Sequence, residues 1–534
     1  MSELLTLLVL LPLVAAALLA CIPASAERAH QRLALLAALG QWLLSLQLLQ
    51  GDFQSGALQF VQKLEWVEAL GLHYHLGVDG LSLWMALLST FLVPCVLWTR
   101  SARISPSKGF NIACLGLQSA VLGALFAHDL LLFYIFWELM LVPALFLMGI
   151  WGHAAAARRF FLYTFITSLP FLVGIMVVGY HFHQLAGHWS FDLSDLTRLV
   201  LPFSVQRWLF IAFFVAFAAK AALLPLHRWL PMAYRQCSPG TVALLSAVLS
   251  KLGAYGLLRF ATPLCPLGAY YWGPPAASLA IATLLFAAFC AWRQQDLRGV
   301  LAYSSMSHVA LIMLGAFSLS ITGITGSLLQ MLAHGISSAA LFLMVGMLCQ
   351  RSSSDSLDEV GGIAATMPRY SILFCIFVLS AIALPGTGAF VGEWLILAGT
   401  FTSYKLLPWS RGLAVVATLT VIFGAVYMLR VMRKLVWGAQ KQPTERAPSD
   451  LNRHELWVLV PFAFLVFWLG LVPGPFLARS EPTVRRWVSH LEQRFDIMLK
   501  DDTARLISVE DLAVQDGPEG HHHGHTHDHH EAAP

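Results

Sequence analysis

The sequence predicts an all-α integral membrane protein with about fourteen transmembrane helices. Hydrophobic residues make up 58% of the 534-residue chain and charged residues only 12%, whereas a typical soluble domain carries about a quarter charged residues. The mean hydropathy is +0.69, and a water-soluble fold of this length could not bury so much apolar surface. Apolar runs of about 20 residues, the length that crosses a bilayer core, recur along the whole chain.

Short connections separate the apolar runs, which favours one compact bundle over several domains. We expect spans near 4–21, 33–50, 80–98, 110–127, 129–149, 160–180, 206–224, 242–260, 275–292, 298–316, 324–348, 370–400, 412–430 and 455–478. Ser2 and Glu3 precede the first run, so the basic segment of a cleaved signal peptide is missing and we interpret this run as a retained helix. We therefore expect a transmembrane domain over 1–480 and an extramembrane tail over 481–534.

The distribution of positive charge predicts the orientation. Most Lys and Arg residues follow odd-numbered spans, among them Arg159, Arg228, Arg298 and Arg351. Because cytoplasmic loops carry an excess of Lys and Arg, the odd-numbered loops are expected to be cytoplasmic and both termini to face outward. The basic tail after the last span favours the opposite orientation, but earlier loops usually dominate.

Two predicted spans contain sequences that break a helix. Pro225 and Pro231 interrupt the seventh span, and LPGTG at 384–388 interrupts the twelfth. Proline removes a backbone donor, and irregular backbone at membrane depth is tolerated only inside protein or beside water. The breaks lie five helices apart, which predicts two inverted five-helix repeats, helices 4–8 (about 110–260) and 9–13 (about 275–430), with broken helices 7 and 12.

Titratable side chains lie inside six of the predicted spans, where a charge costs about 2.5–3.5 kcal/mol on insertion scales. They are Glu138, Lys220, Lys251, His308, His334 and Glu393. Glu138 lies nine residues after Asp129, and at 1.5 Å per residue this places it about 13 Å deep, near the middle of the bilayer. Buried Glu, Lys and His side chains each have two accessible protonation states near neutral pH. The series therefore predicts a proton relay.

Each candidate also has a structural interpretation. Glu138 and Lys220 could form a static ion pair that fixes helix packing. His308 and His334 could hydrogen-bond to neighbouring helices, and Glu393 could cap backbone N–H groups freed by the helix break. A bundle with only such structural roles predicts that neutralising Lys220 lowers stability and leaves turnover unchanged.

The sequence also argues against several other kinds of site. The eight cysteines are scattered, with no CxxC pair, which argues against iron–sulfur clusters, zinc ribbons and a disulfide framework. The sequence has no Walker A loop and no dinucleotide-binding GxGxxG unit. It has no dense Lys/Arg stripe for nucleic acid either. We expect no redox cofactor and no nucleotide site in this chain.

The motifs around the candidate residues carry a family resemblance. They are DLLLFYIFWELMLVPALFLMGIWG at 129–152, FAAKAALLPLHRWLP at 217–231, KLGAYGLLRF at 251–260, MLAHGISSAALFL at 331–343 and LPGTGAFVGEWLIL at 384–397. Over about residues 70–435 the chain resembles the M-type antiporter-like, proton-translocating subunit of respiratory complex I, NADH:quinone oxidoreductase. The wider superfamily includes Mrp-type antiporters, membrane-bound hydrogenases and inorganic-carbon-uptake relatives.

The resemblance implies a role for each candidate. Glu138 and Lys220 match the pair that gates a half-channel, Lys251 the central lysine, His334 the helix 11 histidine, His308 the SxSH position and Glu393 the exit group. It implies a proton-translocating enzyme subunit in a bacterial inner membrane, with periplasmic termini, beside other membrane-arm subunits that carry the redox chemistry. The alternative is a cation/proton antiporter or inorganic-carbon-uptake coupling subunit without NADH oxidation.

The chain departs from the family pattern after the seventh span. Where the family usually reads LPDAH, this sequence has LPMAY, so Met232 and Tyr234 replace an acid and a histidine. Before the tenth span, Arg298 and Gly299 stand in place of the usual basic pair. These departures leave the expected fold unchanged and fit a chain adapted to a variant complex.

The C-terminal tail has two features. Residues 484–500 show helical apolar spacing and are expected to form an amphipathic surface helix. The stretch HHHGHTHDHH at 521–530 could hold a divalent metal loosely through imidazole. The candidate ligands are His521, His522, His523, His525, His527, His529 and His530. The alternative is a disordered polar tail or the remnant of a tag.

Overall fold

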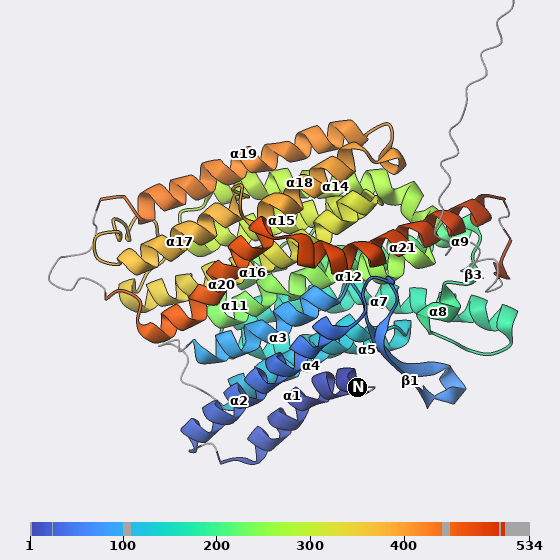
Figure 1. Cartoon of the computed structure of the whole chain (residues 1–534), viewed down its shortest axis with the longest axis horizontal. Helices are drawn as coiled ribbons and strands as arrows, with labels where there is room; N and C mark the ends of the chain where they lie inside the picture. The colour runs from blue at the N-terminus through green and yellow to red at the C-terminus, as the bar shows by residue number, and fades with distance from the viewer. Residues whose placement is uncertain (1–2, 24, 100–107, 440–448, 501–502, 508–534) are drawn as a thin grey trace, which may run out of the picture.

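The chain forms a long bundle of helices in the computed structural model (Figure 1). The structure describes residues 3–23, 25–99, 108–439, 449–500 and 503–507. Among these residues, 12 helices are long and apolar enough to cross a membrane, and three further apolar helices are shorter. The predicted all-α integral membrane class is confirmed. The division into two inverted repeats and the domain boundaries stay predictions.

The first half of the bundle holds helices on both sides of the first break. These are α1 (Leu4–Cys21), α2 (Glu27–Ser45), η1 (Leu46–Gln50), α3 (Leu83–Trp98), α4 (Lys108–Phe126), α5 (Leu130–Leu139), α6 (Leu141–Gly149), α7 (Ala154–Ala186), α8 (Leu193–Leu196), α9 (Phe203–Lys220) and α10 (Trp229–Gln236). Asp129 caps α5 by accepting from the backbone N–H groups of Leu131 and Leu132, both at 2.9 Å. Such a cap satisfies donors that the first turn of a helix leaves free.

The second half continues from α11 to the C-terminal helix. Its elements are α11 (Pro239–Ala247), η3 (Leu249–Lys251), α12 (Leu252–Gly256), η4 (Leu257–Ala261), α13 (Thr262–Leu264), α14 (Pro266–Arg293), α15 (Leu297–Phe317), α16 (Ile321–Ser352), α17 (Pro368–Ala381), α18 (Gly388–Phe401), η5 (Tyr404–Leu406), α19 (Ser410–Leu435), α20 (Arg453–Leu471) and α21 (Gly474–Lys500). The side chains of α15 and α16 are almost all buried, so these two helices form the centre of the bundle.

Both predicted helix breaks are present. The chain leaves the helical conformation between α9 and α10, where Ala222 has a φ of +56°, and again between α17 and α18, where Ala383 has a φ of +54°. A third break lies between α11 and η3, at Val248, with φ −123° and ψ −54°. This third break was not predicted from the sequence, because no proline or glycine marks it.

A β-hairpin that the sequence analysis did not predict joins α2 to α3. Strands β1 (Gln59–Val67) and β2 (Leu72–Val78) pair antiparallel. Strand β1 contains Lys63 and Glu65 and so differs from the long apolar runs that predict the membrane helices. A second, two-residue pairing joins β3 (Leu199–Val200) to β4 (Arg505–Leu506).

Helix α21 runs along the bundle (red in Figure 1) and confirms the helix predicted over 484–500, although it begins at Gly474. The indole of Trp487 donates to the carbonyl of Leu258 at 2.9 Å, and the guanidinium of Arg494 donates to the carbonyl of Leu199 at 2.8 Å. The buried face of α21 therefore packs on the protein itself.

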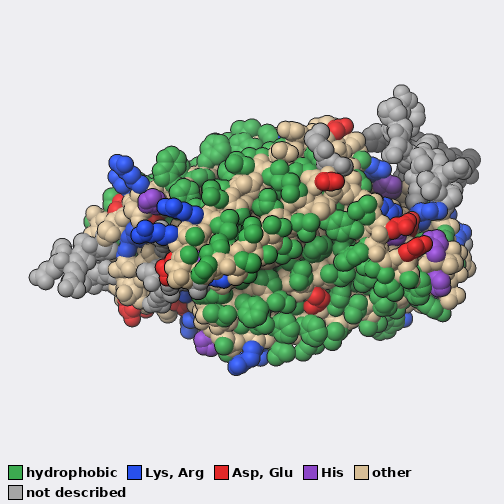
Figure 2. All heavy atoms as spheres, turned by 90° about the horizontal axis from the view of Figure 1, so that it is seen from below, with side chains coloured by type: hydrophobic (Ala, Val, Ile, Leu, Met, Phe, Trp, Pro, Cys, Tyr) green, Lys and Arg blue, Asp and Glu red, His purple; other side chains and the backbone are tan. Residues whose placement is uncertain are grey.

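The outer surface matches a protein surrounded by lipid. Figure 2 shows hydrophobic side chains over most of one face, with charged and His side chains gathered mainly toward its two ends. A broad apolar belt between two charged ends is the arrangement expected across a bilayer.

Candidate functional site

Four of the six predicted relay residues meet in the centre of the bundle. The Nζ atom of Lys251 lies 2.9 Å from Nδ1 of His334. The ring of His334 lies 5.0 Å from the ring of His308, measured between centroids. Nδ1 of His308 lies 3.1 Å from Oε1 of Glu393. These residues come from η3, α16, α15 and α18, so the chain of side chains crosses four elements.

This group is almost completely removed from solvent. The exposed fractions are 1% for Lys251, 5% for His334, 8% for His308 and 4% for Glu393. Isolated charges at such burial are costly, so the groups must share protons or pair with one another. The Nε2 atom of His308 is buried without a hydrogen-bond partner among the described residues. An imidazole with a free nitrogen can take up a proton on one side and release one on the other.

The third helix break positions Lys251. Since α11 ends at Ala247, the carbonyl of Ser246 has lost its helical partner, and Nζ of Lys251 donates to it. The lysine therefore bonds both to the broken backbone and to His334. This double contact explains how a lysine with no acid in its own helix is held at the centre of the bundle.

Glu138 and Lys220 approach each other without forming an ion pair. Within the described part of the chain, no bridge of 4.0 Å or less joins them, and Nζ of Lys220 has no hydrogen-bond partner. This Nζ instead lies 4.4 Å from the ring centroid of Trp137, a cation–π contact. The carboxyl group of Glu138 lies near the hydroxyl groups of Tyr134 and Ser168.

A gap in hydrogen bonding separates Lys220 from Lys251. Helices α9 and α12 pack closely here, since a Cβ atom added at Gly253 would lie 2.4 Å from the carbonyl oxygen of Phe217. No hydrogen bond between the two lysines is present among the described residues. The structure thus brings Lys251, His334, His308 and Glu393 together. It leaves Glu138 and Lys220 as a separate pair.

Two uncharged polar side chains lie beside the central chain, and one of them, Gln330, is bonded to it. Nε2 of Gln330 donates to Oε1 of Glu393 at 3.2 Å. The hydroxyl of Tyr427 donates to Oγ of Ser304 at 3.2 Å. Neither residue was among the candidates predicted from the sequence, which were all Glu, Lys or His. Gln330 precedes His334 by one helical turn and so lies on the same face of α16, which is a signal that could have identified it.

A second charged group lies where the hairpin meets the bundle. Nζ of Lys63 and Nδ1 of His75 both lie 2.8 Å from Oδ2 of Asp192. Burial raises the pKa of Asp192, but His75 and Lys63 outweigh this effect and hold the pKa far below its usual range. Nearby, burial raises the pKa of Asp129 to about 6. These groups attach the hairpin to the cap of α5, the helix that carries Glu138.

The candidate metal ligands belong to the His-rich stretch of the C-terminal tail. The stretch 521–530 lies outside the described residues. Within the described residues, no group of three or more His, Cys, Asp or Glu side chains is arranged to hold a metal ion. The expectation of a chain without a redox cofactor stays a prediction.

Comparison with known proteins places this arrangement in a family. The family model described as NADH:quinone oxidoreductase/Mrp antiporter, TM, matches residues 127–428. The chain belongs to this family. The matched region contains all six candidate relay residues, so the buried series lies within the part that defines the family.

Relatives match over nearly their full length. The chain is 37% identical over 491 residues to NADH-ubiquinone oxidoreductase chain 4 of Arabidopsis thaliana, covering 90% of this chain and 96% of the relative. It is 36% identical over 517 residues to NADH-quinone oxidoreductase subunit M of Rhodobacter capsulatus, covering 93% of this chain and 97% of the relative. A chain of respiratory complex I from Thermus thermophilus superimposes with a TM-score of 0.81 at 30% identity. The superposition covers 91% of this chain and 99% of the Thermus chain.

Proposed function

We propose that this chain is the proton-translocating M-type subunit in the membrane arm of a complex I-like NADH:quinone oxidoreductase. The observation that carries the proposal is the buried contact series from Lys251 through His334 and His308 to Glu393, in a member of this family. The full-length match to subunit M and chain 4 relatives favours this function over an antiporter or carbon-uptake subunit. Redox chemistry belongs to partner subunits of the same assembly.

The contacts support one order of proton transfer. A proton leaves Nζ of Lys251 for Nδ1 of His334 across 2.9 Å, which leaves a neutral amine and an imidazolium. It passes from His334 to His308, and then across 3.1 Å to the carboxylate of Glu393. The first and last steps are within the distance at which a positioned acid and base exchange a proton. The middle step joins two rings whose centroids are 5.0 Å apart, with no hydrogen bond between them among the described residues, so it needs one intervening water or a rotation of a ring.

The electrostatic field of Glu138 and Lys220 controls proton release from Lys251, the first member of the series. Because Lys220 rests on the ring of Trp137 rather than on Glu138, its positive charge can move toward or away from the carboxylate. Movement toward Glu138 reduces the positive potential at Lys251 and favours its protonated form. Movement of Lys220 back toward Trp137 favours release of the proton from Lys251 to His334.

The distribution of charge supports an orientation as well. We place the chain in a bacterial inner membrane, with the arginine-bearing α10, the start of α15 and the end of α16 toward the cytoplasm and both termini toward the periplasm.

The test is proton pumping by membrane vesicles that contain the whole complex. Pumping driven by NADH is measured for Glu138→Gln and Lys251→Ala, with Glu68→Gln, an exposed carboxylate of the hairpin region, as the control. We expect the two buried variants to assemble and to lose most pumping, and the control to pump normally. Normal pumping by assembled Lys251→Ala would overturn the proposal.

A further inference from the structure

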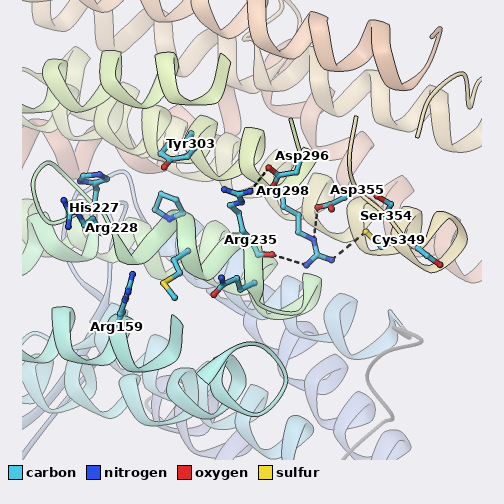
Figure 3. Close-up of a pocket in the computed structure, with 14 residues that line it drawn as sticks. Arg159, His227, Arg228, Arg235, Asp296, Arg298, Tyr303, Cys349, Ser354 and Asp355 are labelled. Carbon is cyan, nitrogen blue, oxygen red and sulfur yellow. Dashed lines mark hydrogen bonds and ion pairs between the residues drawn. The ribbon is translucent and has the colours of Figure 1, made fainter. Parts of the chain in front are cut away.

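A basic pocket lies at one end of the bundle, apart from the relay residues. Its volume is about 750 Å³, and its walls include Arg159, Arg228, Arg235 and Arg298 (Figure 3). None of the six relay side chains lines it. The pocket lies near the start of α7, the start of α15 and the end of α16, which are three candidate membrane spans. We call it the arginine pocket.

Two of the arginines are neutralised by acids of the same pocket. Nη2 of Arg235 lies 2.8 Å from Oδ1 of Asp296, and Nε of Arg298 lies 3.4 Å from Oδ2 of Asp355. Asp296 also caps α15 by accepting from the N–H of Gly299 at 2.9 Å. Both acids are therefore already engaged by an arginine.

The other two arginines, Arg159 and Arg228, have no ion pair among the described residues. Both are exposed and reach the pocket from different segments, Arg159 from α7 and Arg228 from the break before α10. With four arginines and two aspartates, the walls carry a net formal charge of +2 when His227 is neutral. The hydroxyl of Tyr303 adds a neutral donor.

We propose that the arginine pocket binds a phosphate group, carried either by an anionic phospholipid headgroup or by free inorganic phosphate. Guanidinium groups hold phosphate oxygens through paired N–H donors. Helix ends of membrane spans lie at headgroup depth, where basic pockets between helices bind anionic headgroups. The bound anion supplies the negative charge that the pocket's own acids do not provide.

The experiment uses the whole complex in nanodiscs of phosphatidylcholine. A photoreactive phosphatidylglycerol is titrated, and its crosslinks to this chain are quantified. The Arg159→Gln/Arg228→Gln double variant is compared with Arg158→Gln, which removes the neighbouring exposed arginine outside the pocket. Since each basic residue near an anionic surface contributes roughly a factor of five, we expect binding about 25-fold weaker in the double variant. The control should bind as the wild type does.

Equilibrium dialysis with radioactive inorganic phosphate separates the two sources of the ligand. Crosslinking that depends on the arginines and persists in added phosphate assigns the group to lipid. Phosphate binding that depends on the arginines assigns it to the free ion. The Arg159→Lys/Arg228→Lys variant keeps the charge and should bind partially, which separates anion binding from a folding defect. Binding of neither ligand, or equal binding by the wild type and the glutamine double variant, would overturn the proposal.

Discussion

Lys251 and His334 lie 2.9 Å apart in a part of the bundle where neither side chain is more than 5% exposed. Two basic groups this close cannot both carry a proton without strong repulsion, so they titrate as a pair that shares one. Under the proposed function, this contact makes His334 the first acceptor for a proton released by Lys251.

The His334→Gln variant tests this role. Glutamine keeps a polar side chain on α16 but has no group that accepts and releases a proton near neutral pH. We expect NADH-driven pumping by the assembled complex to fall by roughly a hundredfold, the usual contribution of a positioned acid–base group. Ser338→Ala, one turn along α16, is the matched control. Unimpaired pumping by His334→Gln would remove this histidine from the relay.

A double-mutant cycle tests the exit step between His308 and Glu393. Because these side chains are 3.1 Å apart and act in series, removing either should stop transfer at the same point. We expect His308→Gln, Glu393→Gln and the double variant to lose pumping to about the same extent, which is strongly non-additive behaviour. Additive losses in vesicle assays would show that the two residues belong to separate routes.

The buried pair of Asp79 and Arg259 should act on stability. Oδ1 of Asp79 lies 2.6 Å from Nη2 of Arg259, and their exposed fractions are 4% and 6%. Asp79→Asn leaves the guanidinium uncompensated, which costs about 3–5 kcal/mol. We expect a lower melting temperature of the detergent-purified complex. The Asp79→Leu/Arg259→Met double variant should be less destabilised than Asp79→Asn, because it leaves no buried charge unpaired. A double variant less stable than Asp79→Asn would show that the unpaired guanidinium is not the main cost.

Asp129 should make stability depend on pH. Burial raises the pKa of this carboxyl group to about 6, above the ordinary value of about 3.9. The folded protein therefore binds a proton that the unfolded chain has released. The stabilisation from that proton is complete below about pH 4 and is lost as pH rises to about 6, a change of about 3 kcal/mol.

The Asp129→Asn variant keeps a capping side chain on α5 and does not titrate. We expect its melting temperature to lack the wild-type decrease between about pH 4 and pH 6. Thermal unfolding over this range checks the result, with Asp52→Asn, which lies in an exposed loop, as the control. The same pH profile in Asp129→Asn and wild type would contradict the assigned shift.

Much of the fold could be predicted because membrane helices depend on apolar length and because proline and glycine mark the breaks after Lys220 and Ala381. The break at Val248 could not be predicted, since the lysine that satisfies the freed carbonyl is itself positioned by His334 on another helix. The six candidate relay residues could each be predicted from the sequence, because a titratable side chain inside a membrane span costs free energy. Which of them touch depends on how α15, α16 and α18 pack, and no local pattern contains that information.

Under the proposed function, Lys251 carries a proton, and its bond to the carbonyl of Ser246 also holds the two parts of a broken helix together. A charged ammonium is a stronger donor than a neutral amine. Loss of the proton from Lys251 therefore weakens its hydrogen bond to the carbonyl of Ser246, and reprotonation strengthens that bond again. The protonation state of Lys251 is in this way linked to the rigidity of the backbone at the break between α11 and η3.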